Sequence, residues 1–217
     1  MLAGLPDHST KREKRMLHKV QKRDAVRAAK VLASAFRHDP GWNKICEGES
    51  DIGKRFRAIF EVAVRFGLTY GEVYAPSEDL EGIIAWVPGK CADMNTWHMI
   101  RSGALVAAMR IGLNVTKKMG AAYKPVTDYR REYMALHTFR YLLVFGVPTE
   151  LQGKGFGRKL IEAVIEKSDR DKLQLYVGAG SEENVKTYEH FGFRVLKQFT
   201  LPIIDLPEWE MVRDPKV

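Results

Sequence analysis

Apolar residues recur at helical spacing in two segments of the first third of the chain. Residues 23–36 repeat small and apolar side chains every three to four positions and Pro40 follows, so the pattern predicts a helix that ends in a turn. Residues 51–70 separate apolar from basic side chains, which predicts a second, amphipathic helix. Its apolar side holds Ile52, Phe56, Ile59, Phe60 and Val64.

Strand patterns begin after these helices. Residues 72–76 and 81–89 are short apolar runs separated by a polar turn, which predicts a hairpin. Residues 90–137 are rich in Ala, Met and Leu and too long for a loop, so we expect two or three helices that cover one side of a sheet. The rest alternates between strands and helices: strand 139–147, helix 155–169, strand 173–179, helix 182–191, strand 194–202 and strand 209–213. This alternation predicts an α/β layered domain with a parallel pair of strands at its centre.

Length and cysteine content narrow the class of protein. A chain of 217 residues, 45% hydrophobic, can bury one substantial core, which favours a single domain. Cys46 and Cys91 lie far apart and outside any C-x-x-C pattern, which disfavours a disulfide framework or a zinc site and favours a reducing, cytoplasmic setting. The longest apolar run, YLLVFGV, is far shorter than the roughly 20 residues of a membrane helix, so no membrane partner is expected.

The positive charge is concentrated at the N-terminus. The formal net charge is +8, and residues 1–30 hold nine Lys or Arg against three Asp or Glu, which leaves the remainder close to balance. We therefore predict a basic, flexible arm over residues 1–18 and a single domain over residues 19–217. A solvated arm of this kind gives no reason to expect a nucleic-acid partner.

A glycine-rich turn joins a predicted strand to a predicted helix in QGKGFG, residues 152–157. Such turns bind phosphate groups, because free backbone N–H groups and the positive end of the helix dipole point outward there. A P-loop requires a hydroxyl residue after its Gly-Lys pair, where this chain has Gly155, and a dinucleotide fingerprint requires G-x-G-x-x-G, where this chain reads G-x-G-x-G. Both of these phosphate loops are disfavoured.

The remaining pattern, Q-x-x-G-x-G, resembles the acetyl-CoA-binding signature of the GNAT acyltransferase superfamily. The flanking segments LLVFGVPTELQGKGFGRKLIEAVIE and SEENVKTYEHFGFRV resemble two consecutive signature segments of that family. EGIIAWVPGK and WEMVR resemble the branch that includes puromycin-type small-molecule acetyltransferases. The resemblance implies a mixed central sheet flanked by helices, with a helical insert at about residues 90–137 between the third and fourth strands.

The resemblance also implies a set of site residues, with acetyl-CoA as the donor and no metal. The pantetheine arm is expected along Phe145 and Val147, and Tyr188 is expected to act as the general acid, because a phenol can protonate the departing thiolate. The residues expected at the diphosphate and the adjoining part of the cofactor are Gln152, Gly153, Lys154, Gly155, Phe156, Gly157, Arg158 and Asn184. Glycine admits backbone dihedrals that other residues avoid and lets a diphosphate approach the amides.

The acceptor side is less defined by the sequence. We expect a primary amine on a small molecule, attacked directly in a ternary complex; a protein lysine or N-terminal acetyltransferase and a non-catalytic CoA-binding regulatory module remain alternatives. The oligomeric state stays open between monomer and homodimer. Candidates for a general base are Glu72, Glu132, His137 and Glu150, and Trp42, Tyr70 and Trp86 are candidates for an apolar acceptor wall.

Overall fold

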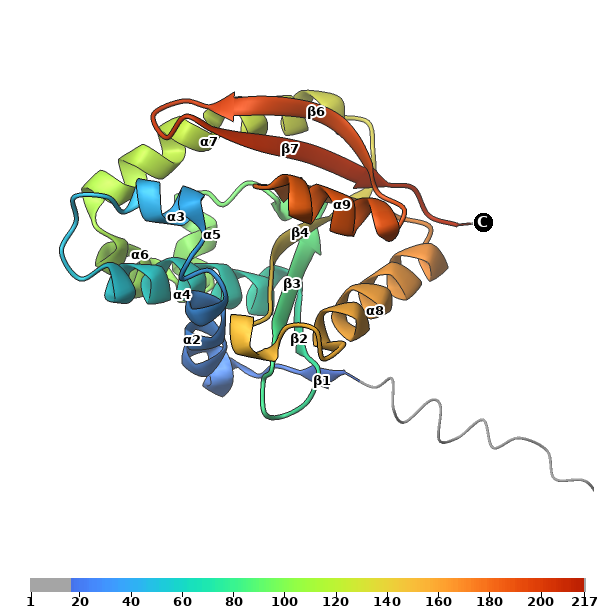
Figure 1. Ribbon diagram of the computed structural model, residues 1–217, viewed down its shortest axis with the longest axis horizontal. Helices are drawn as coiled ribbons and strands as arrows, with labels where there is room; N and C mark the ends of the chain where they lie inside the picture. The colour runs from blue at the N-terminus through green and yellow to red at the C-terminus, as the bar shows by residue number, and fades with distance from the viewer. Residues whose placement is uncertain (1–16, 217) are drawn as a thin grey trace, which may run out of the picture.

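Seven strands form one mixed sheet in the order β1-β2-β3-β4-β5-β7-β6 in the computed structural model, which describes residues 17–216 (Figure 1). Every neighbouring pair is antiparallel except β4 and β5, so the predicted mixed α/β sheet with a central parallel pair is confirmed. The strands are β1 (His18–Lys19), β2 (Glu72–Ala75), β3 (Ile83–Pro88), β4 (Phe139–Gly146), β5 (Gln174–Ala179), β6 (Arg194–Leu201) and β7 (Leu206–Arg213).

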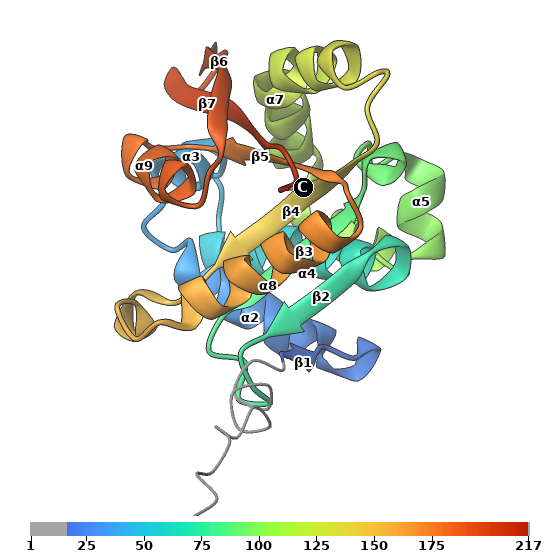
Figure 2. The same ribbon diagram turned by 90° about the vertical axis from the view of Figure 1, so that its right-hand side faces the viewer.

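Helices cover both faces of the sheet. The helix α8 lies across one face, with α2 and α4 behind the sheet on the other (Figure 2). Three helices, α5 to α7, lie between β3 and β4 in the chain. The helices are α2 (Ala25–Ala35), α3 (Pro40–Ile45), α4 (Ile52–Tyr70), α5 (Thr96–Arg101), α6 (Leu105–Ile111), α7 (Leu113–Tyr133), α8 (Phe156–Arg170) and α9 (Glu182–His190), with short 3₁₀ turns η1 (Lys22–Asp24), η2 (Gly89–Cys91) and η3 (Thr149–Leu151).

The hydrophobic core is divided by the sheet. On the face of α8 and α9, Leu160 and Val164 pack against Leu175 and Met211, all fully buried. On the face of α2 and α4, a second cluster joins the apolar sides of both helices to β2 and β3. A third cluster links α4, α6 and α7 to the end of β6. The apolar sides of the two helices that were predicted at residues 23–36 and 51–70 therefore pack against the same face of the sheet.

The two central strands separate soon after they meet. β4 and β5 pair only at Phe139–Tyr141 with Gln174–Tyr176, whereas β4 continues along β3 as far as Gly146. The β3–β4 register shifts between Ala85 and Trp86, which leaves Leu143 as an extra residue in β4. Such a bulge bends a strand and is common beside active sites. The edge of β4 that faces β5 is consequently free of strand pairing after Tyr141.

The N-terminal third differs from the sequence prediction at two places. Pro40 does not simply break the first helix; it starts α3, whose N-terminus is capped by the Asp39 side chain accepting a hydrogen bond from Trp42 N at 2.9 Å. Proline is favourable in the first turn of a helix, because the N–H group that it lacks would have no intrahelical acceptor there. Residues 1–16 of the predicted arm lie outside the described residues, while His18 pairs with Ala75 and so belongs to the sheet.

The C-terminal part follows the prediction more closely. β7 begins at Leu206, three residues before the predicted strand, and it lies inside the sheet between β5 and β6. Within residues 17–216, none of the helices combines the length and hydropathy needed to cross a bilayer.

Candidate active site

The glycine turn forms an open, left-handed connection between β4 and α8. Gly153 has φ +75° and Gly155 has φ +84°, the region that favours glycine, and no atom lies within 4 Å of a Cβ built at either position. Gly155 caps α8, and the first backbone bond of that helix runs from Lys159 N to Gly155 O at 3.0 Å. The preceding N–H groups of Phe156, Gly157 and Arg158 have no intrahelical acceptor. The turn thus presents free donors at the positive end of a helix.

The side chain of Gln152 braces this turn. Its Nε2 donates a hydrogen bond to Val147 O at 3.0 Å, across the short 3₁₀ turn η3. The amide therefore ties the end of β4 to the start of the glycine turn. The Gln152 side chain therefore stabilises the backbone of the turn, and the carbonyl of Val147 accepts this hydrogen bond.

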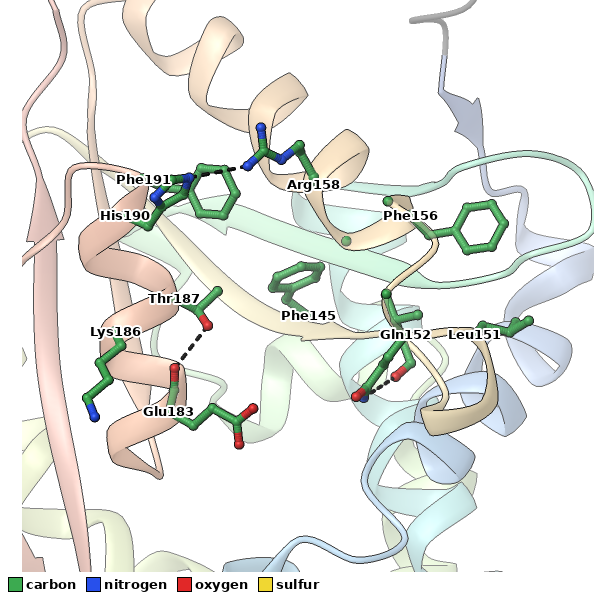
Figure 3. A pocket seen from close by; sticks show the side chains of 14 residues that line it. Phe145, Leu151, Gln152, Phe156, Arg158, Glu183, Lys186, Thr187, His190 and Phe191 are labelled. Atoms are coloured by element: carbon green, nitrogen blue, oxygen red, sulfur yellow. Dashed lines mark hydrogen bonds between the residues drawn. The ribbon is translucent and has the colours of Figure 1, made fainter.

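A groove of about 590 Å³ opens between the glycine turn and α9 (Figure 3). Its lining consists of Phe145, Val147, Leu151, Gln152, Gly153, Gly155, Phe156, Gly157, Arg158, Glu183, Lys186, Thr187, His190 and Phe191. Eight of these are residues that the sequence singled out, since only Lys154, Asn184 and Tyr188 of the eleven are missing from this lining. Lys154 is exposed on the turn itself.

The residues on α9 form the opposite wall, which the sequence analysis missed. Glu183, Lys186, Thr187 and His190 follow the spacing i, i+3, i+4, i+7, so they share one face of the helix. This spacing of polar residues was the sequence signal from which the second wall of the groove could have been predicted. Across the groove, Arg158 Nη2 lies 3.3 Å from His190 Nε2, and the Arg158 guanidinium also lies 3.7 Å from Glu162. The mouth of the groove is therefore lined by basic side chains.

Asn184 and Tyr188 occupy the other sides of α9. Asn184 is exposed, and its backbone N–H donates to the capping hydroxyl of Ser181 at 3.2 Å. Tyr188 is buried, and its ring packs against Phe193 with centroids 5.2 Å apart. Burial and then the negative charge of Glu208 raise the pKa of Tyr188, so its hydroxyl keeps its proton at neutral pH.

Two buried carboxylates on β7 were not found from the sequence. Glu208 is 9% exposed and Glu210 is 4% exposed, and they point to the same face of the strand. Trp209, between them, packs on the α8 and α9 face. Glu210 lies opposite Gly178 of β5, and a Cβ on Gly178 would come within 2.5 Å of Glu208 Oε1. The missing side chain at Gly178 therefore makes room for both carboxylates.

Burial shifts the titration of both groups upward. Desolvation, together with the charges of Glu210 and Asp39, raises the pKa of Glu208 to about 8. Desolvation also raises the pKa of Glu210 to about 7, partly offset by the Tyr176 phenol and the charge of Arg130. The alternation of Glu, Trp and Glu in one strand was the only sequence signal, and its meaning depends on β7 lying inside the sheet.

The base candidates from the sequence do not meet at the groove. Glu72 forms an ion pair with Lys167, and Glu132 and Glu150 are exposed. His137 is exposed and stacks on Tyr133 with centroids 6.0 Å apart. None of them lies among the groove residues.

The three aromatic residues proposed as a wall are also separated. Trp42 packs between Phe60 and Tyr123, at centroid distances of 5.6 Å and 6.2 Å. Trp86 stacks on Tyr74 at 5.2 Å, and Tyr70 packs against Phe66 and His98. A single wall built from all three is therefore wrong, because their side chains fill three different packing groups.

Comparisons with known proteins agree with this architecture. The family model of the acetyltransferase (GNAT) domain matches residues 131–200. An uncharacterized N-acetyltransferase of Schizosaccharomyces pombe is 31% identical in an alignment of 183 positions that covers 81% of this chain and 72% of the relative.

Solved structures share the fold at low sequence identity. One, described as histone acetyltransferase HPA2 and related acetyltransferase from Corynebacterium glutamicum, has a TM-score of 0.63 at 16% identity and covers 93% of this chain and 97% of its own. Arylalkylamine N-acetyltransferase 2 from Aedes aegypti has a TM-score of 0.62 at 13% identity, covering 93% and 99%. The sequence relative and the family model, together with the shared fold, show that the chain belongs to the GNAT family of N-acetyltransferases and is an acyltransferase.

Proposed function

We propose that the protein transfers an acetyl group from acetyl-CoA to a primary amine of a small molecule, by direct attack in a ternary complex. The observation that carries this proposal is the alignment of three features: the open glycine turn, the groove behind it, and the unpaired edge of β4. Together they provide backbone N–H groups that can bind an anion and, next to them, a groove beside the unpaired edge of β4.

The donor fits the residues at this end of the site. Backbone N–H groups of Phe156, Gly157 and Arg158 suit a diphosphate, because they are oriented outward and need no rearrangement. Lys154 and Arg158 add positive charge from the exposed side. The pantetheine arm would follow β4 past Phe145 and Val147, bonding to the strand as an added strand would. Asn184 would contact the cofactor from the start of α9.

The donor supplies an acetyl thioester, whose sulfur leaves as a thiolate. Tyr188 holds a proton on Oη at neutral pH because burial raises its pKa, so a proton is available for the departing thiolate. This supports Tyr188 as the general acid. A backbone N–H in the Phe145 to Val147 segment would stabilise the negative charge on the carbonyl oxygen during attack.

The packing of the inserted helices against the N-terminal helices favours a small-molecule acceptor over a protein. Tyr123 of α7 stacks on Trp42 of α3, so the helices inserted between β3 and β4 pack against the N-terminal helices. A peptide acceptor needs an open groove, whereas a covered site suits a compact amine. Both cysteines are free thiols, which supports a reducing, cytoplasmic location.

Acetyl-CoA titration followed by a thiol-release assay over a panel of amines tests the proposal. We expect saturable binding and release of coenzyme A with small amines. Binding without release for any acceptor would instead favour a regulatory module, and release only with peptides would favour a protein acetyltransferase.

Tyr188→Phe tests the acid separately. We expect kcat to fall by about 100-fold, the lower end of what general acid catalysis contributes, with the KM for acetyl-CoA unchanged. The ring contact with Phe193 is retained by phenylalanine, so the fold should persist. An unchanged kcat would assign the acid role to another group.

A further inference from the structure

Glu208 and Glu210 lack the counter-charge that buried carboxylates normally have. Within residues 17–216, no hydrogen-bond donor and no cation pairs with Glu208. Arg130 is the cation that acts on Glu210, but its guanidinium already lies 2.7 Å from Asp93 and 4.6 Å from the ring of Tyr141. Two buried carboxylates with so little compensation destabilise a fold. Their presence therefore calls for an explanation other than stability.

Most of the groups that surround the pair are acceptors or neutral phenols, and the two cations, Arg130 and Lys197, lie on the side of Glu210. Asp39, at the start of α3, raises the pKa of Glu208 by its own charge. The titratable or charged neighbours, element by element, are Asp39 before α3, Tyr123, Tyr129 and Arg130 of α7, Tyr141 of β4, Tyr176 of β5, Tyr188 of α9 and Lys197 of β6, which is the cross-strand partner of Glu210. Lys197 is exposed, and its ammonium lies over the rings of Tyr129 and Phe199. The raised pKa values of Glu208 and Glu210 mean that the pair retains protons near neutral pH until a cation compensates it.

An unsatisfied hydroxyl points to the same place. Tyr176 is fully buried, and its Oη makes no hydrogen bond of normal length among the described residues; burial, the charge of Glu210 and a weak hydrogen bond toward Glu210 raise its pKa. A buried polar atom without a partner is rare in a native protein and is often explained by a missing ligand or water. The hydroxyl thus marks the surroundings of Glu210 as incomplete without a bound group.

The pair lies close to the proposed general acid and beside the gap between β4 and β5, although neither carboxylate lines the groove. Glu208 contributes to the raised pKa of Tyr188, so the carboxylate and the proposed acid act on each other across the sheet. Gly178 of β5 and Gly180, just after that strand, have no side chains, and Glu208 fills the space: its oxygens lie 2.5 Å and 3.4 Å from the positions that a Cβ would occupy there. β4 and β5 are no longer paired at this level.

We propose that Glu208 and Glu210 form the subsite for the acceptor amine, in which they bind its ammonium group and Glu208 removes the proton that must leave before attack. This inference rests on the proposed function. One N–H bond of the ammonium breaks and its proton passes to a carboxylate oxygen of Glu208, then to solvent. The neutral amine attacks the acetyl carbon, and the second proton that it loses balances the one that Tyr188 gives to the thiolate.

The titration of the pair suits this task. An alkylamine resembling Lys has a pKa of about 10.4, and an ordinary carboxylate is far too weak a base to accept its proton readily. Burial narrows the difference by raising the pKa of Glu208 to about 8. The second carboxylate remains to balance a positive charge in the substrate.

The charge of this subsite defines a substrate class. An acceptor that has a carboxylate close to its amino group would place a fourth carboxyl group beside Asp39, Glu208 and Glu210. Like charges in a buried site repel by several kcal/mol. The acceptor is therefore a cationic amine without an acidic group near the reacting nitrogen, and a second positive group is tolerated or favoured.

Three probes with the same four-carbon chain test the substrate class: 1,4-diaminobutane, n-butylamine and 4-aminobutanoate. For the wild-type protein we expect kcat/KM to fall in that order, with the amino acid at least about 100-fold below the diamine. Glu210→Gln should reduce this difference by about 10-fold. A preference for 4-aminobutanoate would overturn the assignment.

Glu208→Gln tests the proton transfer through the pH profile. The wild-type kcat/KM should rise with a midpoint near pH 8 and level off above it, because the carboxylate must be ionised to accept the proton. In the variant, kcat/KM at pH 7.5 should drop by about 100-fold and keep rising toward the amine pKa of about 10.4, because only the free amine then reacts. Glu208→Asp should restore the plateau in part.

Glu78→Gln is the matched control, since it removes one exposed carboxylate in the loop between β2 and β3. It should leave rate and profile unchanged. Thermal melting provides a readout without turnover: 1,4-diaminobutane should raise the Tm of the wild type and of Glu78→Gln, but not that of Glu208→Gln.

The outcomes distinguish this inference from the function on which it rests. If acetyl-CoA binds and amines are acetylated while Glu208→Gln keeps the wild-type profile, the subsite is refuted and the acetyltransferase stands. If no amine is acetylated but 1,4-diaminobutane still stabilises the wild type selectively, the subsite stands and the proposed function fails. Absence of both effects refutes both.

Discussion

The two ends of the proposed site hold opposite charges by opposite means. At the donor end, the glycine turn presents backbone N–H groups and exposed basic side chains along an open groove. At the acceptor end, Glu208 and Glu210 present side-chain carboxylates that are almost completely buried. The first backbone N–H groups of a helix have no intrahelical partner, so an anion site at a helix start requires little loss of folding free energy. Buried carboxylates without partners destabilise it, so the acceptor end depends more on its ligand.

Gly155→Glu should give the largest effect, because it tests the donor end directly. The new carboxylate would repel the diphosphate, and a side chain at φ +84° strains the turn, so acetyl-CoA binding should weaken by about 1,000-fold, or about 4 kcal/mol. Isothermal titration calorimetry measures the change.

Gly48→Glu is the control for this variant. Gly48 also has a positive φ, +82°, and a Cβ added there would meet no atom within 4 Å, so charge and backbone strain are matched far from the groove. Equal losses of acetyl-CoA affinity in both variants would contradict the role of the glycine turn.

Gly178→Ala should disturb the acceptor end alone. Its Cβ would meet Glu208 Oε1 at 2.5 Å and Glu210 Oε1 at 3.3 Å, and these flexible carboxylate ends must move away. We expect kcat/KM for the amine to fall by about 10-fold, since small misplacements of a base slow proton transfer, with acetyl-CoA affinity unchanged. Steady-state kinetics and acetyl-CoA titration check both parts.

Gly180→Ala supplies the comparison for that variant. Its Cβ would lie 3.4 Å from Glu208 Oε2, an ordinary contact, so the carboxylate can stay in place. Similar losses in the two alanine variants would mean that the position of the carboxylates is not what matters.

Arg158→Gln should have the smallest effect and so sharpens the contrast within the donor end. The Arg158 side chain is 61% exposed, and exposed charges contribute about 0.2–1 kcal/mol, so the Kd for acetyl-CoA should rise by roughly 1.4- to 5-fold. The increase should shrink at high salt because the interaction is screened. Arg57→Gln, at an exposed position of α4, is expected to leave the Kd unchanged.

The conformation of the proposed donor end could be predicted from the sequence because its geometry is local. The strand, the glycine turn and α8 follow one another, so the spacing of Gly153, Gly155 and Gly157 already specified the backbone conformation and the free N–H groups. Eight of the predicted residues line the groove for that reason. The periodicity of the helices likewise made the two faces of the sheet predictable.

The acceptor end could not be predicted because it depends on distant pairing. Glu208 and Glu210 are buried only because β7 enters the sheet between β5 and β6, which no local pattern specifies. Pro40 was misleading for a different reason: the same residue ends one helix and starts another, and the cap from Asp39 decides which. Trp42, Tyr70 and Trp86 are all aromatic, but their side chains pack in three different parts of the core.

The position of β7 also sets the order in which the enzyme becomes complete during synthesis. All of the donor groove lies in residues that leave the ribosome before β7, which must then pair with β5 on one side and β6 on the other. The pairing with β6 is a local hairpin, whereas the pairing with β5 is non-local and is expected later in folding. A nascent chain would thus contain every residue of the groove before it contains Glu208 and Glu210, and the proposed mechanism requires that β7 has already paired.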